Sequence, residues 1–475
     1  MIKNATLAIL GIALASTGCG DDDDPAIQND SDTEVETGPI GGNVLILFLD
    51  DVGVDKVGAY GVHPDAPPTP NIDGLADGGV LFRAGYANPS CSPSRASLLT
   101  GRYGRRTGLG GVTELYSSSY SLPHDEVVLP EVVKASATLD YDTSMVGKWH
   151  LTNGDVPDYE NEPLTHGFDW YAGSLGNLTS STDRTRPLTY YNWQKCSNGT
   201  LAMTQEYATT DTVDDALDRV TQMPEPWLLY VAFNAPHTPL GQPPPELHTQ
   251  TDLTPQSDRL ERYDATMEAL DTEIGRLLGG LDVDVRDRTT ILLIGDNGTP
   301  EHAVAPPFSQ DQSKLAQFEG GILVPFIVTG PAVGQPGTES HAMVHVVDVL
   351  PTVAELAGVD VSELLRNGAP VVLDGQSLVP HLADPETVGR ETLYAERFFD
   401  SGAPPYGFDA RSVRDDRYKL IYKDGLVGFF ELGVDPPHEG PDLMEVGLSA
   451  VQQAAFDALE QDMARRVADM VYEGP

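Results

Sequence analysis

The stretch CSPSRASLLTGR, residues 91–102, is the most informative part of the chain. Ser92 can cap a helix with its hydroxyl, and Gly101 can end that helix in the left-handed conformation. We therefore expect Cys91 to lie just before a helix N-terminus. Free backbone amides and the helix dipole favour an anion at such a place, and Arg95 lies one turn further along. The stretch predicts a binding place for an oxygen of sulfate or phosphate.

Apolar runs on both sides of this stretch predict the fold. Residues 43–49 form a continuous apolar run, which is typical of a strand buried on both faces. Similar runs occur at residues 143–146, 227–233, 289–294 and 325–328. Residues 259–278 carry apolar side chains at helical spacing. Strands that alternate with helices predict an α/β fold with a large, mixed but mostly parallel sheet flanked by helices.

The pattern changes near residue 378. Short strand-like runs follow at residues 393–396, 411–413, 418–422 and 428–432. Residues 448–471 have the pattern of a single amphipathic helix. We expect a catalytic domain over residues 43–378 and a smaller α+β domain, a short antiparallel sheet plus a helix, over residues 379–475.

The N-terminal residues predict export. An apolar run too short to span a bilayer leads to Cys19, in a sequence similar to a bacterial lipoprotein cleavage box. We assign residues 1–19 to a signal peptide with this box and residues 20–42 to an acidic, flexible tether. Ser16 stands where such boxes usually carry Leu, so lipid attachment at Cys19 and simple secretion both stay open. The expected location is the bacterial cell envelope, in the periplasm or as an outer-membrane lipoprotein, or outside the cell.

The formal net charge of the 475 residues is −43. This charge argues against nucleic acid as a partner, and against an anionic membrane except through a lipid anchor. It also means that any site for an anionic substrate must gather positive charge locally. A metal ion and a few basic side chains are the available sources.

Polar side chains follow two of the predicted strands directly. Asp50 and Asp51 come after the first strand, and Asp296 and Asn297 come after the fourth. Ligands bind beyond the carboxyl ends of parallel strands, so these side chains are candidates for one site. They form a set of hard oxygen ligands that suits Ca²⁺ or Mg²⁺ better than zinc, whereas the thiolate of Cys91 is a soft ligand. Either pair alone is more typical of solvated loop residues.

Basic residues provide the remaining candidates. Lys148 and His150 follow the run at 143–146, and if that strand continues they point to the same face. A cation beside an imidazole suits anion binding and proton transfer. His237 follows another strand on a proline-flanked loop, and Lys314 precedes the sequence FEGGI. Each of these residues alone would be interpreted as a structural or surface residue.

Together the motifs resemble the type I sulfatase family, within the alkaline phosphatase superfamily, from residue 43 onward. Besides residues 91–102, the resemblance rests on segments in the family's order: TPNIDGLADGGVLF (69–82), VGKWHL (146–151), PH (236–237), GDNG (295–298) and EGGI (319–322). The segments RYKLIY (417–422), FEL (430–432) and DP (435–436) resemble the family's small C-terminal domain. Gly295 and Leu323 depart from the residues that many relatives have, Ser and Arg.

The resemblance implies an alkaline-phosphatase-like fold and a formylglycine-dependent, arylsulfatase-like hydrolase of sulfate monoesters. Cys91 would be oxidised to formylglycine (3-oxoalanine) by a maturation enzyme. A calcium ion, or Mg²⁺ in its place, would be bound by the modified residue 91 together with Asp50, Asp51, Asp296 and Asn297. The hydrated aldehyde offers oxygen to that ion, which removes the mismatch of a sulfur ligand.

The resemblance also implies roles for the basic residues. Arg95 and Lys148 would steady the formylglycine and the sulfate charge, and His150 would accept the proton that lets sulfate leave. Lys148, His237 and Lys314 would bind the sulfate. His237 or Lys314 would protonate the departing alcohol.

The sequence leaves the substrate open. A sulfated carbohydrate is the preferred one, because the chain carries signs of export. The alternative activity is hydrolysis of a phosphonate monoester or phosphodiester, which the same nucleophile and fold also perform. A third interpretation is a catalytically silent carbohydrate-binding lipoprotein in which Cys91 is never converted.

Overall fold

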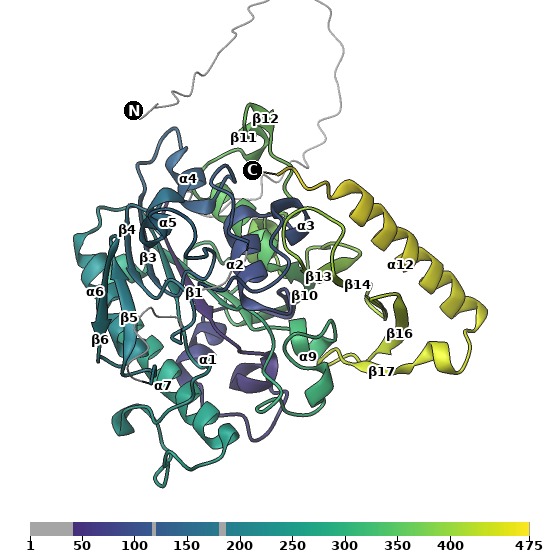
Figure 1. Cartoon of the computed structure of the whole chain (residues 1–475), viewed down its shortest axis with the longest axis horizontal. Coiled ribbons are helices and arrows are strands. Elements are labelled where there is room, and N and C mark those ends of the chain that lie inside the picture. Colours follow the sequence, from purple (N-terminus) through teal and green to yellow (C-terminus); the bar gives the residue numbers. More distant parts are fainter. Residues whose placement is uncertain (1–40, 116–119, 180–186, 475) are drawn as a thin grey trace, which may run out of the picture. The chain divides into compact units, whose positions relative to one another are not determined.

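The computed structural model describes residues 41–115, 120–179 and 187–474 (Figure 1). The predicted signal peptide with Cys19, and all but the last two residues of the predicted tether, lie outside this part of the chain. Within the described ranges, no helix combines the length and the apolar character that a membrane span requires.

A ten-stranded mixed sheet forms the centre of the fold, in the order β10-β2-β9-β8-β1-β7-β3-β4-β5-β6. Neighbouring strands from β8 to β4 run parallel, as do β2 and β10, whereas β9 runs antiparallel to β8 and β2. This arrangement confirms the predicted large, mostly parallel sheet. The strands are β1 (Asn43–Leu49), β2 (Gly79–Tyr86), β3 (Asp142–Gly147), β4 (Trp170–Gly173), β5 (Trp193–Ser197), β6 (Thr200–Thr204), β7 (Trp227–Ala232), β8 (Thr289–Gly295), β9 (Phe326–Thr329) and β10 (Thr338–His345).

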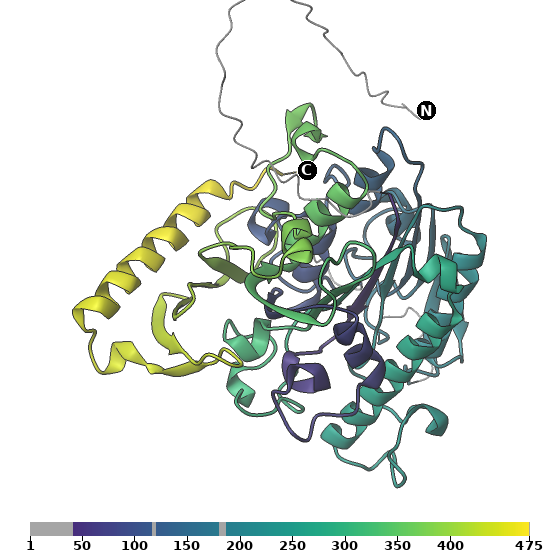
Figure 2. The same cartoon turned by 180° about the vertical axis from the view of Figure 1, so that it is seen from behind.

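Helices cover both faces of this sheet (Figures 1 and 2). Alternate residues of β1 belong to two different apolar cores, because successive side chains of a strand point to opposite faces. One core contains residues of α2, α4 and α10, and the other contains residues of α1, α6 and α7. The helices are α1 (Pro70–Asp77), α2 (Cys91–Thr100), α3 (Gly104–Thr107), α4 (Leu129–Lys134), α5 (Glu162–Thr165), α6 (Ala208–Gln222), α7 (Arg259–Gly280), α8 (Val283–Arg286), α9 (Glu319–Ile322), α10 (Val349–Leu356), α11 (Val379–Ala383) and α12 (Ala450–Asp469).

A second, five-stranded antiparallel sheet follows in the chain, in sequence order. Its strands are β13 (Leu393–Phe399), β14 (Phe408–Arg414), β15 (Tyr418–Lys423), β16 (Leu426–Leu432) and β17 (Glu439–Asp442). Leu459 and Met463 of α12 pack with Val413, Leu420 and Phe429 of the sheet in a third core. The smaller α+β unit predicted from the sequence is therefore present. A short hairpin, β11 (Leu365–Arg366) and β12 (Ala369–Pro370), precedes it.

Candidate active site

Four neighbouring parallel strands, β8, β1, β7 and β3, end at the same edge of the large sheet. The register pairs Leu49 with Gly295, Phe48 with Ala232, and Gly147 with Ala232. The loops that follow these strands therefore start side by side, as expected for ligand sites in parallel sheets. These loops carry seven of the predicted site residues: Asp50, Asp51, Lys148, His150, His237, Asp296 and Asn297.

Helix α2 brings the cysteine to this edge. The helix begins at Cys91, with Ser90 as its extended N-cap, and ends at Gly101 with a φ of 67°. The expectation that Ser92 caps the helix is wrong, since the Ser92 hydroxyl accepts a hydrogen bond from the backbone N–H of Thr113 at 2.9 Å. Proline is tolerated throughout the first helical turn, so Pro93 does not prevent the helix from starting two residues earlier. Cys91 is thus the first helical residue.

The thiol of Cys91 lies among charged groups. The side chain is buried, its Sγ donates to Oδ1 of Asp50 at 3.4 Å, and Nζ of Lys314 lies 3.5 Å from the sulfur. Burial, then the carboxylates of Asp296 and Asp50, raise the pKa of the Cys91 thiol well above its ordinary value. The unmodified thiol is therefore protonated at neutral pH, and a protonated thiol is a poor nucleophile and a poor metal ligand.

Two lysines neutralise the first pair of carboxylates. Nζ of Lys148 donates to Asp50 at 2.5 Å, and Nζ of Lys314 donates to Asp51. Burial would raise the pKa of both aspartates, but Lys148 holds that of Asp50 well below its ordinary value and Lys314 lowers that of Asp51. Asn297 adds a hydrogen bond from its amide nitrogen to Asp51 at 2.9 Å. Both carboxylates are therefore ionised and available as ligands.

The third carboxylate, Asp296, is held by the protein. Its two oxygens accept hydrogen bonds from the backbone N–H of Asp51 and from the guanidinium of Arg95, each at 3.0 Å. Burial and then the nearby charge of Asp50 raise the pKa of Asp296 to about 7. The lysines therefore offset only part of the electrostatic repulsion among the three carboxylates. A divalent cation bound between them would offset the rest.

Arg95 lies beneath the site and has no contact with solvent. Besides Asp296, its guanidinium donates to the backbone carbonyl of Lys148 at 2.8 Å and stacks 5.3 Å from the centre of the Phe48 ring. Burial would lower the pKa of Arg95, but the Asp296 carboxylate raises it above its ordinary value. Arg95 thus positions the carboxylate of Asp296 and the backbone just after the end of β3.

The chain leaves β3 before it reaches Lys148. Gly147 has a φ of +95°, and a Cβ there would lie 2.0 Å from the carbonyl oxygen of Ala232, so the extended strand ends at this glycine. The expectation that the strand continues through Lys148 and His150 is therefore wrong. Both side chains are nevertheless buried beside the other site residues, and His150 has a left-handed φ of 60°.

His150 is a neutral imidazole in this environment. Burial, followed by the nearby charge of Lys148, lowers the pKa of His150 well below its ordinary value. Its Nδ1 has no hydrogen-bond partner among the described residues. A neutral ring with a free nitrogen can accept a proton.

His237 lies on the loop after β7 and faces Asp51. Its Nδ1 lies 2.7 Å from the carbonyl oxygen of Thr238, which only a ring N–H can satisfy, and its Nε2 lies 3.9 Å from Oδ2 of Asp51. In the neutral ring Nε2 is therefore the free acceptor. Burial lowers the pKa of His237.

The residues present fit a hard divalent cation. Ligand atoms of Asp50, Asp51, Cys91 and His237 all lie within 4.8 Å of one another. Oδ1 of Asn297 is buried without a hydrogen-bond partner among the described residues, which is costly unless another group binds it. The oxygens suit Ca²⁺ or Mg²⁺, and the sulfur of Cys91 is the one poorly matched atom. Sequence reasoning did not place His237 among these ligand atoms.

Further residues that the sequence did not reveal support the strand-end loops. Tyr263 of α7 donates to the backbone carbonyl of Asp51 at 2.6 Å. Thr299 donates to Asp55 at 2.6 Å and accepts the backbone N–H of Gly53 at 3.1 Å. Thr299 and Asp55 lie close to the motif residues in sequence, which was the available signal. No local pattern marks Tyr263, because it reaches the site only through the packing of α7.

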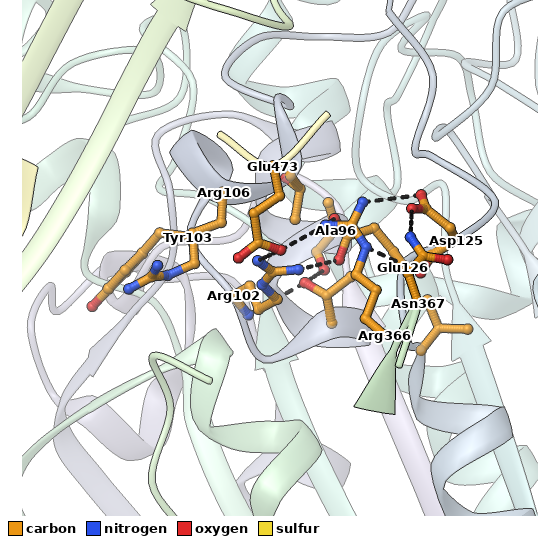
Figure 3. Close-up of polar contacts among 12 residues, drawn as sticks. Ala96, Arg102, Tyr103, Arg106, Asp125, Glu126, Arg366, Asn367 and Glu473 are labelled. Atoms are coloured by element: carbon orange, nitrogen blue, oxygen red, sulfur yellow. Dashed lines mark hydrogen bonds and ion pairs between the residues drawn. The ribbon is translucent and has the colours of Figure 1, made fainter. Parts of the chain in front are cut away.

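A second buried charge cluster lies past the C-terminal end of α2, and we call it the Arg102 network (Figure 3). Arg102 donates to Glu126 and to Glu473, each at 2.7 Å. Arg366 donates to Glu473 at 2.8 Å and to Asp125 at 2.9 Å. The network joins the end of α2 to the β11–β12 hairpin and to the segment after α12.

Comparisons with known proteins show the family of the chain. The family model described as Sulfatase matches residues 42–359, and the model described as N-sulphoglucosamine sulphohydrolase, C-terminal, matches residues 313–469. The chain is 31% identical to N-acetylgalactosamine-6-sulfatase of Homo sapiens over 383 residues, 74% of this chain and 68% of that protein. It is 32% identical to Arylsulfatase A of Bos taurus over 468 residues, 88% of this chain and 85% of that protein.

A solved structure gives the same result at the level of the fold. The crystal structure of Ps i-CgsB in complex with k-i-k-neocarrahexaose superimposes with a TM-score of 0.74 at 25% identity. The match covers 90% of this chain and 93% of that one.

Proposed function

The chain belongs to the sulfatase family and is a sulfuric ester hydrolase, and from that premise we propose that it removes sulfate from a sulfated carbohydrate. We propose further that it uses a formylglycine made from Cys91 and a divalent cation. The observation that carries the proposal is the position of residue 91: its Sγ lies 3.4 Å from the Asp50 carboxylate and 3.5 Å from Nζ of Lys314. A thiol is chemically unsuited to that position, and an aldehyde hydrate is suited to it.

The conversion of Cys91 is a two-electron oxidation at Cβ. A maturation enzyme would perform it with an external oxidant such as dioxygen, the sulfur would leave as hydrogen sulfide, and an aldehyde oxygen would take its place. Water then adds to the aldehyde. The hydrate supplies one hydroxyl that attacks the sulfur of the substrate and a second that later expels the sulfate.

The basic residues of the site handle protons and charge. Lys148 and Lys314 supply positive charge for the sulfate oxygens inside a buried site, where such charge is most effective. Lys314, or His237 once its Nε2 has been protonated, gives a proton to the alcohol as its bond to sulfur breaks. His150, the neutral imidazole, accepts the proton that is released when sulfate leaves and the aldehyde forms again.

The acidic residues hold the cation. Asp50, Asp51, Asp296 and Asn297 would bind Ca²⁺, or Mg²⁺ in its place, together with the modified residue 91. The ion would supply positive charge next to the sulfate and the nucleophile. Arg95 contributes indirectly, because it fixes the carboxylate of Asp296.

Names of similar proteins support a carbohydrate substrate. One relative is named as a sulfatase of N-acetylgalactosamine-6-sulfate, and one similar structure was solved with k-i-k-neocarrahexaose. Export to the cell envelope or out of the cell, by lipid attachment at Cys19 or by secretion, belongs to the same proposal and agrees with a polysaccharide substrate outside the cytoplasm.

Mass spectrometry combined with product analysis tests the proposal. Trypsin should release residues 84–95 from protein made in its native host, and this peptide should carry formylglycine at position 91. The same preparation should release sulfate from members of a panel of defined sulfated sugars, and release it faster than phosphate from matched aryl phosphodiesters. An active preparation with an unmodified thiol would contradict the mechanism, and faster release of phosphate would contradict the substrate class.

A further inference from the structure

We propose that a pocket beside Lys314 binds an anionic group of a neighbouring sugar, so that the enzyme selects sulfated oligosaccharides over small sulfate esters. This inference rests on the proposed function. The pocket has a volume of about 260 Å³ and lies between the loop around Lys314 and one face of the small sheet. Drug-sized ligands occupy about 300–1,000 Å³, so the volume suits a group the size of one sugar ring.

The floor of the pocket is a row of residues across three strands. Arg397 of β13 pairs with Ala410 of β14, and Ala410 pairs with Lys423 of β15. Directly paired residues point to the same face of a sheet. The small alanine between two long cationic side chains leaves a hollow with positive charge on both sides. All three residues line the pocket.

Arg397 is a cation without an acidic partner. Its guanidinium donates to the backbone carbonyl of Leu315 at 2.8 Å and lies over the rings of Phe399 and Phe408, at 4.6 and 5.4 Å from their centres. No Asp or Glu in the described part of the chain pairs with it, and burial lowers the pKa of Arg397. Lys423, which is exposed, forms no ion pair with a described residue either.

Unpaired cations are informative in this chain because its net charge is −43. On the same small sheet Arg411 lies 3.4 Å from Asp409, and Arg417 lies 2.7 Å from Glu431. One carboxylate, that of Asp311, does line the pocket, but it is exposed and accepts a hydrogen bond from Ser309 at 2.6 Å. An anionic ligand would give Arg397 the charged partner that the protein does not supply.

The remaining surface of the pocket suits a sugar. Phe408 lines it, so an aromatic side chain is present against which a sugar ring can pack. Gln317, which also lines the pocket, donates its side-chain amide to the carbonyl of Ala410 at 3.3 Å and so holds this loop against β14.

The pocket is connected to the reactive centre through one residue. Lys314 lines the pocket, and its Nζ contacts both Asp51 and the sulfur of Cys91. The next residue, Leu315, donates its backbone N–H to the carbonyl of Pro89 at 2.8 Å, two residues before Cys91. A sugar adjacent to the one that carries the reacting sulfate would therefore reach Arg397 and Lys423.

The test compares substrates with the same reacting sulfate. The four probes are 4-nitrophenyl sulfate, a sulfated tetrasaccharide with neutral neighbouring sugars, and two counterparts of that tetrasaccharide with a carboxylate or a second sulfate on the neighbour. Arg397→Ala and Lys423→Ala should each lower kcat/KM for the anionic tetrasaccharides about 10- to 100-fold, the range of a charge-assisted hydrogen bond. The two counterparts distinguish a carboxylate from a sulfate as the group that is bound.

Arg417→Ala is the matched control. Arg417 is exposed on the same sheet, just before the opposite end of β15, so its loss should leave the rates with all four probes unchanged. The preference of the parent enzyme, which carries no substitution, for anionic tetrasaccharides should also fall as the salt concentration is raised, because salt screens exposed charges. In the Arg397→Ala and Lys423→Ala enzymes that preference should be smaller and less sensitive to salt.

Two outcomes would contradict the proposed subsite. The first is that the ratio of kcat/KM for the anionic and the neutral tetrasaccharides is the same in the variants as in the parent enzyme. The second is that Arg397→Ala lowers kcat/KM equally for all probes. Arg397 also holds the backbone of Leu315 beside Lys314, so an equal loss would mean that its role is purely structural. Lys423 makes no such contact and separates the two roles. A parent enzyme that releases no sulfate from any probe would contradict the proposed function instead.

Discussion

Helix α2 has a cluster of charged side chains at each end. The two clusters differ in whether they contain polar atoms that lack a suitable partner. At the N-terminal end, Asp50, Asp51 and Asp296 face Lys148, Lys314 and Arg95. At the C-terminal end, the Arg102 network also joins arginines to carboxylates. The first cluster contains a thiol among oxygen ligands, and next to it lies the buried amide oxygen of Asn297 without a partner.

The two clusters also differ in how the chain brings their residues together. The first is built on loops that follow neighbouring strands, where Asp51 and His150 have left-handed φ values of 71° and 60°. The Arg102 network instead connects distant parts of the chain: Arg102 and Glu473 are 371 residues apart. Buried charge alone therefore does not mark an active site. Changes in the first cluster should affect activity, and changes in the second should affect stability.

The largest expected effect is that of Cys91→Ala. Turnover should be abolished, because the proposed nucleophile derives from this side chain. The free energy of unfolding should change little, since the substitution removes one buried sulfur atom. Sulfate release and thermal unfolding measure the two effects, and appreciable residual turnover would disprove the mechanism.

Asp296→Ala should remove both the bound metal and the activity. The substitution deletes one proposed ligand and removes the carboxylate that accepts a hydrogen bond from the buried Arg95. Metal content after purification and sulfate release are the measurements, with the exposed Asp284→Ala as a control that should retain both. A fully active Asp296→Ala enzyme with its metal would exclude Asp296 from the site.

Glu126→Ala should lower the free energy of unfolding by about 3 kcal/mol, the lower end of the cost of breaking a buried ion pair, because Arg102 and Arg366 keep the partly exposed Glu473. Arg102 and Arg366 both lie against Glu126 in the interior. Urea denaturation measures the loss, and kcat of the folded fraction should stay unchanged. A fall in kcat without a fall in stability would mean that the Arg102 network contributes to the chemistry.

Lys314→Ala should lower kcat/KM by about 100- to 1,000-fold, as expected when a group that stabilises developing charge is removed. Both substrate binding and turnover should weaken, because Lys314 contacts Asp51 and residue 91. Steady-state kinetics on one sulfated sugar measures this change. Unchanged kinetics would contradict the proposed role of Lys314.

The smallest effect should come from Glu473→Ala, at about 1 kcal/mol or less. Glu473 contacts the same arginines as Glu126, but its side chain is 40% exposed and water can replace it. Urea denaturation beside Glu126→Ala provides the comparison. Equal losses in the two variants would mean that burial does not control the strength of these ion pairs.

The central strands and the site at their ends were predictable from the sequence. The runs that became β1, β7 and β8 are apolar without interruption because both faces of these strands are covered, and parallel strands bring the residues that follow them to one edge. Strands β2 and β10 were not predicted. β10 is partly exposed, and its polar residues interrupt the apolar pattern.

Side-chain directions at the site were not predictable. Whether Arg95 faces a substrate or Asp296 depends on the rotation of α2 against the sheet, which no local pattern encodes. The end of β3 at Gly147 depends on the close approach of Ala232 from the neighbouring strand. The Arg102 network also escaped prediction, because its partners lie far apart in sequence.

The burial of Cys91 limits the time at which another protein can modify this side chain. The side chain is 1% exposed, so another protein cannot reach its Cβ once the chain has folded. If Cys91 is converted as we propose, conversion must precede folding, and a molecule that folds first keeps its thiol while it stays folded. The specific activity of a preparation would then depend on the fraction of molecules in which Cys91 was modified before the chain folded.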